Sequence, residues 1–331
     1  MERIAKLKRN IHFVALVALL FLLPTFIESN FYLHIMIMTA LNIVLAASLW
    51  LILRSGQLSI GHAAFMAIGA YTSALLTMRI GLSFWLSMPL AGALAAVIAL
   101  VIGYPSLRLR GLFFAIVTFA FAEIVRVVFN SFGRGLFGGA SGISGIPRPS
   151  LFAIEISSKV EYYYLIILLM LLTLIVLHRI NGSRIGMILV AISQADALAE
   201  SIGINIMKYK ILAFVTGSFF AGVAGSFFAH YITHISPELF TFWVSVYVLI
   251  YVIVGGTGSI AGPIVGACAL SFFHESFRTF GDYEPIVFGV SLMIVVLFLP
   301  EGFIGLPSRI WAFAREAAKK GRYQICQPPS R

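Results

Sequence analysis

Charged residues are scarce in this chain of 331 residues: Asp, Glu, Lys and Arg make up 11% of it, whereas hydrophobic residues make up 60%. Soluble domains carry about 25% charged residues, so the composition excludes an ordinary soluble globular protein. The mean hydropathy is +0.99. Apolar runs of about 20 residues recur along the whole chain, which indicates a polytopic membrane protein.

Other absences exclude further classes of protein. The two cysteines, Cys268 and Cys326, are too few for a disulfide framework or a metal site. No Gly-Lys dipeptide occurs, so the chain does not bind ATP through a P-loop. No arrangement of nucleophile and base is apparent either. We therefore expect no enzymatic activity and no bound cofactor or metal. The net charge of +10 comes from residues at span ends and in the tails, which is typical of topology signals rather than of nucleic-acid binding.

Ten apolar runs are candidate membrane spans. They favour an all-α bundle of about ten transmembrane helices, because a helix of about 20 residues crosses the hydrocarbon core of a bilayer. The candidate spans are residues 11–28, 31–53, 60–79, 84–104, 111–130, 162–178, 210–232, 242–256, 262–278 and 285–300. We expect residues 1–307 to form the membrane domain and residues 308–331 a basic cytoplasmic tail.

Basic residues predict which side of the membrane each loop faces, since Lys and Arg concentrate in cytoplasmic loops. The basic N-terminus places the start of the chain inside, and alternation puts the basic loop 179–210 inside as well. The basic tail also belongs inside, which requires an even number of spans and two crossings within residues 242–278. Both termini are thus expected in the cytoplasm. A long outer loop at residues 131–161 either meets a partner or packs over the bundle.

The loop 179–210 is the most informative hydrophilic segment. Residues 187–202 are predicted to form one amphipathic helix that Gly203 ends. The expected apolar face consists of Ile188, Ile192, Ala195, Ala199 and Ile202. The opposite face carries Ser193, Asp196, Ala197 and Glu200, so the helix does not span the bilayer. Its small alanines make a poor lipid anchor, which favours docking onto a soluble protein over lying in the lipid interface.

Two glycine-interrupted segments open predicted spans in opposite halves of the chain. Paired breaks of this kind are typical of a translocation path, because non-helical backbone at membrane depth is buried in protein or lines a watery cavity. Chance similarity is the alternative. The first segment contains Gly56, Gln57, Ser59, Gly61 and His62, and the second contains Gly255, Gly256, Thr257 and Ser259. The alternative for His62 is a purely structural hydrogen bond to a neighbouring backbone carbonyl.

Ionisable side chains within predicted spans are further candidates. Glu123 and Arg126 lie three residues apart, which places them on one helix face. They either shape a charged outer vestibule or close a helix seam. His230 and His234 have helical i, i+4 spacing, a geometry found in metal sites, but only Glu238 nearby could complete such a site.

Short motifs between residues 31 and 307 resemble those of the branched-chain amino-acid ABC permeases, and the LivM type more than the LivH type. The motifs lie at residues 55–65, 142–147, 183–186, 191–192, 199, 201–205, 254–263 and 300–302. One departure is visible at residues 193–196, where Ser-Gln-Ala-Asp replaces a more charged sequence that is usual in the family. This points to a docking surface adapted to its own partner.

The resemblance implies an ABC-importer permease bundle in a bacterial or archaeal plasma membrane. It implies a second homologous permease subunit, two cytoplasmic ATPase subunits that bind ATP-Mg, and an extracytoplasmic substrate-binding protein. In the family, the loop 179–210 would couple the permease to the ATPases. The residues that the match carries over to this role are Arg184, Gly186, Ala191, Ala199 and Gly203, and we expect Asp196 and Glu200 of the same segment to share it.

A branched-chain, hydrophobic amino acid is the expected substrate. Relatives with the same motifs carry urea or short-chain amides, which is the alternative. The rival from another class is an ion-coupled secondary transporter or channel, which would need its own coupling acid. Glu123 is the first candidate for such an acid and Glu275 the second. The scarcity of central acids favours energy supplied by another subunit.

Overall fold

The computed structural model describes residues 20–25, 29–109, 111–131, 134–151, 154–277, 289, 290 and 293. Within these residues the chain folds into an elongated bundle of helices. The predicted span 11–28 lies largely outside the described residues, as does the span 285–300, and the tail 308–331 lies entirely outside them.

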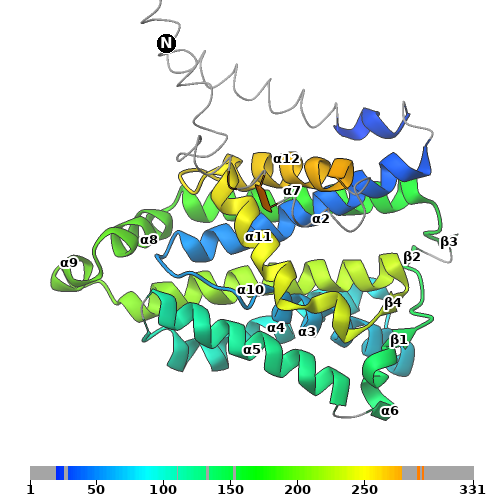
Figure 1. Ribbon diagram of the computed structural model, residues 1–331, viewed down its shortest axis with the longest axis horizontal. Coiled ribbons are helices and arrows are strands. Elements are labelled where there is room, and N and C mark those ends of the chain that lie inside the picture. Colours follow the sequence, from blue (N-terminus) through cyan, green and yellow to red (C-terminus); the bar gives the residue numbers. More distant parts are fainter. Residues whose placement is uncertain are drawn as a thin grey trace, which may run out of the picture.

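Most long helices run along the long axis of the bundle (Figure 1). They are α2 (Asn30–Leu53), α3 (His62–Ile80), α4 (Phe84–Ser106), α5 (Leu112–Ser131), α7 (Lys159–Asn181), α10 (Ile206–Ile232) and α12 (Ala261–Phe277). Helix α11 (Phe242–Gly255) crosses them steeply. The short helices are α6 (Arg134–Phe137), α8 (Arg184–Gln194), α9 (Asp196–Ser201), η1 (Gly139–Ser141) and η2 (Pro237–Phe240).

Four short strands lie at one end of the bundle, and α8 and α9 project from the other (Figure 1). Strand β1 (Ile143–Ser144) pairs antiparallel with β4 (His234–Ile235), and β2 (Ser150–Leu151) pairs antiparallel with β3 (Ile154–Glu155). The strands belong to the connections after α5 and α10. The two ends are therefore different in kind: one is closed by loops, and the other carries a helical extension.

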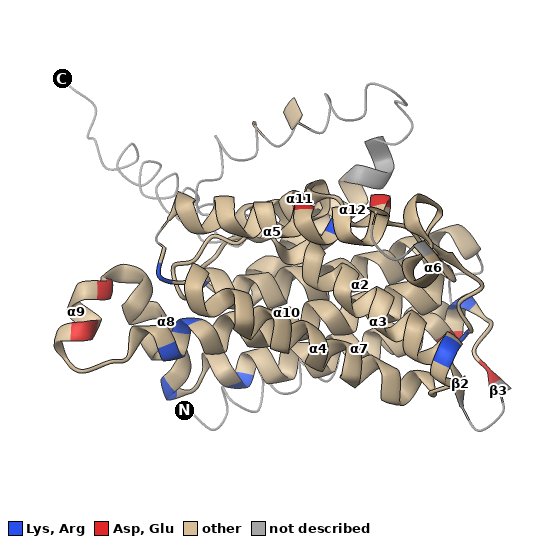
Figure 2. Cartoon of the chain, turned by 90° about the horizontal axis from the view of Figure 1, so that it is seen from below, with Lys and Arg blue, Asp and Glu red and all other residues tan. Residues whose placement is uncertain are grey.

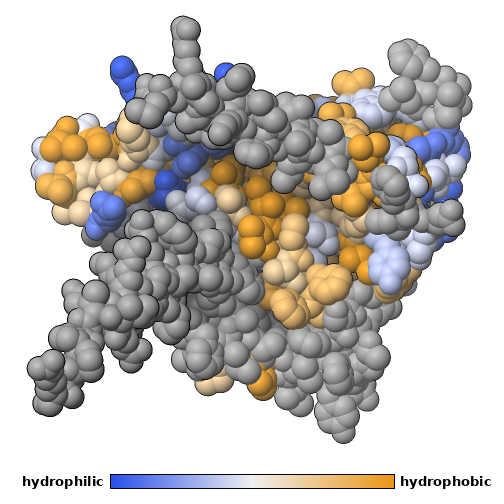
Figure 3. Space-filling view, turned by 90° about the horizontal axis from the view of Figure 1, so that it is seen from above, coloured by the Kyte–Doolittle hydropathy of each residue, from blue (hydrophilic) through white to orange (hydrophobic). Residues whose placement is uncertain are grey.

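The surface has the polarity that a bilayer requires. Charged residues gather at the two ends of the bundle, apart from a small group along its length near α5 and α11 (Figure 2). Seen from another side, the uncovered middle is largely hydrophobic, the right end is hydrophilic, and the left end carries both hydrophilic and hydrophobic residues (Figure 3). Among the described residues, seven helical stretches are long and apolar enough to cross a membrane. The chain is a multi-pass membrane protein.

Eight of the ten predicted spans coincide with helices. Helix α11 agrees with the predicted span 242–256 in extent, but its 14 residues extend only about 21 Å, which is less than the hydrocarbon core of a bilayer. A stretch of crossing length arises only when η2 is included, at Pro237–Gly255. The backbone N–H of Ala63, at the start of α3, donates to Ser245 Oγ, and Trp50 Nε1, near the end of α2, donates to Thr257 O. Helix α11 thus contacts the start of α3 through Ser245, and the residue two positions after its end contacts the end of α2. The ten-span count stays a prediction.

Helix α10 is the centre of the bundle and packs against α2, α3 and α4. Glycines permit this close approach. A Cβ atom built on Gly69 would overlap the carbonyl of Gly222, and one built on Gly225 would overlap the carbonyl of Met66. Small residues at such crossings let helix backbones come close enough for van der Waals contact along their length. The tight bundle that these glycines predict is confirmed.

Local sequence sets several helix ends. Ser158 and Glu161 form a capping box that begins α7, in which Glu161 Oε2 accepts from the backbone N–H groups of Ser157 and Ser158 at 3.0 and 3.1 Å. Gly81 ends α3 in a left-handed conformation with φ of 71°. The Asn205 side chain accepts from the backbone of Lys208 and caps α10.

The outer loop packs over the end of the bundle. His230, buried in the last turns of α10, has its Nδ1 2.7 Å from the carbonyl of Pro147. The Nε2 of the same ring lies 2.9 Å from Ser73 Oγ in α3. This ring therefore joins the outer loop to two core helices. The expectation that the loop meets a binding protein is a separate matter and stays a prediction.

The close contacts of Gly69 and Gly225 between α3 and α10, here called the glycine seam, make a testable prediction. Gly225→Ala should lower the melting temperature of the detergent-purified protein by about 2–10 °C, because overpacking costs about 1–3 kcal/mol. Gly135→Ala is the matched control, since a Cβ there meets nothing within 4 Å. Alanine favours helix over glycine by about 1 kcal/mol, so a higher melting temperature for Gly225→Ala would show that the seam is not tight.

Candidate functional site

The candidate coupling loop forms two helices rather than one. Helix α8 ends at Gln194, Ala195 is extended with φ of −157° and ψ of 94°, and α9 begins at Asp196. The prediction of one continuous helix over residues 187–202 was therefore wrong. Side chains before and after Ala195 no longer share one helical face. The two helices lie beyond the ends of the long helices (Figure 1).

The break changes which residues are buried. Ile192 and Ala199 are buried as expected, and Ile188 is half-buried. Ala195 is exposed, and Ile202 is 70% exposed, contrary to the predicted apolar face. Leu189, which the prediction left out, is fully buried against α2, α7 and α10. Helix α8 is thus packed against the bundle along its length, whereas α9 projects farther and exposes most of its side chains.

Two glycines of the loop have steric reasons for their positions. A Cβ on Gly186 would overlap the carbonyl of Asn181, so only glycine allows the tight corner between α7 and α8. Gly203 has φ of 85° and ends α9, as predicted. Of the other coupling residues, Arg184 and Glu200 are exposed and Ala191 is half-buried.

A buried ion pair ties α9 to the central helix. Lys210 Nζ, in the second turn of α10, donates to Asp196 Oδ2 at 2.9 Å, and the two side chains are 5% and 16% exposed. Asp196 was expected on the outward polar face, but it points instead toward α10. Removing one partner of such a pair leaves a poorly solvated charge, which is strongly destabilising.

A recess of about 520 Å³ lies beside this ion pair. Asp196 and Glu200 line it from α9, Lys210 lines it from α10, and Arg108 lines it from the turn after α4. The recess therefore joins the turn after α4 to the stretch that runs from α9 into α10. Its mixed charges suit a polar protein contact.

The first glycine segment is packed inside the protein. Gln57, Ser59, Gly61 and His62 are all buried. His62 Nε2 lies 2.8 Å from Ser48 Oγ in α2, and the ring also contacts the backbone carbonyl of Leu45, as the structural alternative for this histidine expected.

The same segment contacts two other elements. A Cβ on Gly61 would approach Thr118 O of α5 to 2.7 Å, and one on Gly56, whose φ is 77°, would approach Ser193 Cα of α8 to 3.1 Å. The segment therefore links α2 and α5 to the coupling loop.

The second glycine segment lies beside the end of α2. Trp50 Nε1 donates to Thr257 O at 2.8 Å, and Arg54 donates to Gly258 O at 3.4 Å. Gly255 and Gly256 are buried, Ser259 is half-buried and Thr257 is exposed. The two segments that the sequence singled out thus lie at the same end of the bundle, on either side of α2. Their role in a translocation path stays a prediction.

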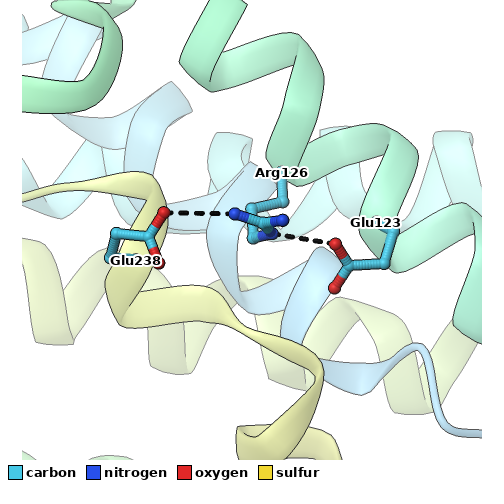
Figure 4. Close-up of polar contacts among 3 residues, drawn as sticks. All are labelled: Glu123, Arg126 and Glu238. Atoms are coloured by element: carbon cyan, nitrogen blue, oxygen red, sulfur yellow. Dashed lines mark hydrogen bonds and ion pairs between the residues drawn. The ribbon is translucent and has the colours of Figure 1, made fainter.

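The predicted pair in α5 is present and has a third member (Figure 4). Arg126 Nε donates to Glu123 Oε2 at 2.9 Å, which confirms the expectation of one helix face. The NH1 group of Arg126 donates to Glu238 Oε1 in η2 at 3.1 Å. The three side chains, here called the α5–η2 ion cluster, connect α5 to the segment between α10 and α11.

His230 and His234 do not lie one helical turn apart in the structure. Helix α10 ends at Ile232, and Thr233 turns the chain in a left-handed conformation with φ of 61°. His230 is therefore buried in the bundle, while His234 lies on β4 with Nδ1 2.8 Å from Ser144 Oγ. Within the described residues, no group of three or more metal-ligating side chains is present.

Sequence reasoning missed Lys210 and Glu238. Lys210 was taken only as one of several basic topology signals, although a lysine directly inside an apolar run is a sign of pairing. Glu238 follows a proline in a loop, and nothing in the local pattern connects it to Arg126. Only the tertiary fold brings them together.

Comparison with known proteins gives the family. A model described as "Branched-chain amino acid transport system / permease component" matches residues 31–299. The chain belongs to this permease family. It is 34% identical over 321 residues to "High-affinity branched-chain amino acid transport system permease protein LivM" of Escherichia coli (strain K12), covering 90% of this chain and 75% of that protein. The LivM protein of Salmonella typhimurium (strain LT2) has the same identity and coverage.

A more distant relative comes from an archaeon. The "Probable branched-chain amino acid transport permease protein LivM" of Methanocaldococcus jannaschii is 22% identical over 237 residues, covering 66% of this chain and 67% of that protein. No solved structure matches the chain. The LivM-type resemblance that the motifs carry is thus confirmed for this permease.

The ion pair of the permease can be tested by a double-mutant cycle. Asp196→Ala and Lys210→Ala should each lower the melting temperature, while the double variant should lose less than the sum, with a coupling free energy of about 0.5–3 kcal/mol. Lys208→Ala is the control, since Lys208 is exposed two residues earlier. Strictly additive effects would show that the two side chains do not interact.

Proposed function

We propose that this permease is the translocating subunit of an ATP-driven importer for branched-chain amino acids. The chain itself hydrolyses no ATP; two cytoplasmic ATPase subunits bind ATP-Mg and supply the energy. A second, homologous permease subunit completes the path, and an extracytoplasmic binding protein delivers the substrate. The family and the relatives named above support this assignment.

The projecting α8–α9 extension is the observation that carries the proposal. Met187, Leu198 and Ile202 are 66%, 67% and 70% exposed on it. Exposed apolar side chains grouped with polar residues are typical of protein–protein contact sites. Because α9 stands beyond the ends of the long helices, its side chains are better placed for a soluble partner than for lipid (Figure 1).

The lipid-interface alternative is less well supported. A helix bound at the lipid surface lies in the membrane plane and buries a broad apolar face with large aromatic or leucine side chains. Helix α9 has only six residues, Asp196–Ser201, and includes Asp196 and Glu200. It is too short and too acidic for that role.

The ion pair gives a route from the ATPase to the membrane. A force on α9 reaches α10 through Asp196 and Lys210, and α10 packs against α2, α3 and α4. The loop with Gly56 also lies against Ser193 of α8. Movement of the extension would thus reach both the central helix and the first glycine segment, which we propose as part of the path together with the second.

The two ends of the bundle would face opposite sides of a prokaryotic plasma membrane. We assign the α8–α9 end, with Arg184 and Lys208, to the cytoplasm, together with both termini, and residues 1–307 to the membrane domain. The loop-covered end would then face the binding protein, with exposed Arg148 available to acids on that partner.

The competing functions draw less support. An ion-coupled transporter needs a free acid within a span, but Glu123 is already paired with Arg126 at 2.9 Å. Urea or short-chain amides remain the alternative substrates within the family. They carry no net or paired charges, so they would make no use of an ionic recognition site.

Glu200→Arg should abolish uptake of leucine while the variant remains in the membrane. The substitution reverses a charge on the exposed face of α9, and like-charge contact across an interface weakens docking. Uptake by cells that express the whole transporter measures the effect, and co-purification of the ATPase subunits measures docking. Glu155→Arg, exposed on the opposite end at β3, is the matched control for co-purification of the ATPase subunits, because it lies away from α9. Undiminished uptake with Glu200→Arg would contradict docking through α9.

A further inference from the structure

The α5–η2 ion cluster lies at an unusual depth. Glu123 and Arg126 are the twelfth and fifteenth of the 20 residues of α5. A helix of that length crosses about 30 Å, so both side chains belong to the middle and outer parts of the span. Charged residues at such depth are rare, costly in lipid, and characteristically face a bundle interior or a watery cavity.

The cluster is nevertheless accessible. Its side chains are 29% exposed at Glu123, 27% at Arg126 and 65% at Glu238. Lipid is a poor neighbour for three charges, so the face on which they lie has to border water or another protein subunit. A path shared with a second permease subunit provides both.

The chemistry of the cluster matches a zwitterion. A guanidinium group has five N–H donors, and the two carboxylates take up Nε and NH1. The remaining donors suit the carboxylate of a ligand, since Arg binds carboxylates in planar, bidentate geometry. Two carboxylates and one guanidinium leave a formal charge of −1, which attracts an ammonium group. Glu238, as the most exposed of the three, is the natural acceptor for it.

An apolar surface adjoins the charges. Phe119 lies one turn before Glu123 on the same side of α5 and is 37% exposed. Its ring meets that of Phe242 edge-on at 5.3 Å between centroids. Phe242 in turn contacts Trp243, which is 56% exposed. An aromatic shelf of this kind, directly inward of the charges, suits an aliphatic side chain.

We propose that the α5–η2 ion cluster is a recognition site within the translocation path for the charged backbone of a hydrophobic α-amino acid. Arg126 binds the α-carboxylate, Glu238 binds the α-ammonium, Glu123 holds the guanidinium in place, and the shelf of Phe119, Phe242 and Trp243 receives the side chain. The site rests on the importer function proposed above. It also separates the two substrate classes, because urea and neutral amides lack the charges that it would bind.

The test uses the whole transporter, with its binding protein, in proteoliposomes supplied with ATP and radiolabelled leucine. Glu123→Gln/Arg126→Met/Glu238→Gln removes all the charges together, a change that is often neutral for folding because no unpaired charge is left. Leucine uptake should fall by about ten-fold or more, since one charge-assisted hydrogen bond contributes about that factor. ATP hydrolysed per leucine carried should rise. Glu155→Gln, an exposed acid outside the spans, is the control for assembly of the membrane subunits, which it should leave unchanged.

The outcomes are distinct. A triple variant that assembles and carries leucine at the wild-type rate overturns the recognition site. The cluster would then have only a structural role. If the triple variant does not assemble, Glu238→Gln decides, because it keeps the pair between Arg126 and Glu123; unchanged uptake and unchanged ATP use by this variant also overturn the site. A wild-type transporter that carries no leucine would instead overturn the proposed function.

Discussion

The close approach of α10 to α3 and α4 is the constraint on which the rest of the molecule depends. In lipid, apolar side chains gain little by leaving the solvent, so helices associate through tight packing and polar contacts. Gly69, Gly222 and Gly225 permit backbone contact that no other residue would allow at those positions. The helices that carry the two ends of the structure are thereby fixed to one rigid seam.

Polar anchors extend this seam to both surfaces. At one end, Lys210 ties α10 to α9 through Asp196. At the other, His230 bridges Pro147 of the outer loop and Ser73 of α3, while Ser226 donates to Ser73 at 2.8 Å. One helix of 27 residues therefore connects the coupling extension to the outer loop. A rigid helix with specific partners at both ends transmits displacement as a unit, which suits the alternating access that the proposed importer would require.

The helices were predictable from sequence, but many of the decisive contacts were not. Long apolar runs located eight helices to within a few residues, and the i, i+3 spacing of Glu123 and Arg126 gave their pairing. The break at Ala195 was hidden, because apolar residues continue at helical spacing through it, and the ion pair of Asp196 with Lys210 favours a different orientation of α9. Glu238 could not be connected to Arg126, since 112 residues separate them. His230 and His234 do not share a helical face, because α10 ends at Ile232 and Thr233 turns the chain.

The charges of the α5–η2 ion cluster also argue against a purely structural role in joining two helices. Burying a pair of opposite charges costs hydration that their attraction only partly restores, so replacing a purely structural pair by apolar side chains is often neutral or stabilising. Here the pair in α5 is supplemented by a second acid, so the group carries an uncompensated charge that lipid cannot stabilise. Two carboxylates around one guanidinium repel each other unless a further cation or water is near. The arrangement therefore favours a wet, cation-attracting surface, which is the setting that the proposed recognition site requires.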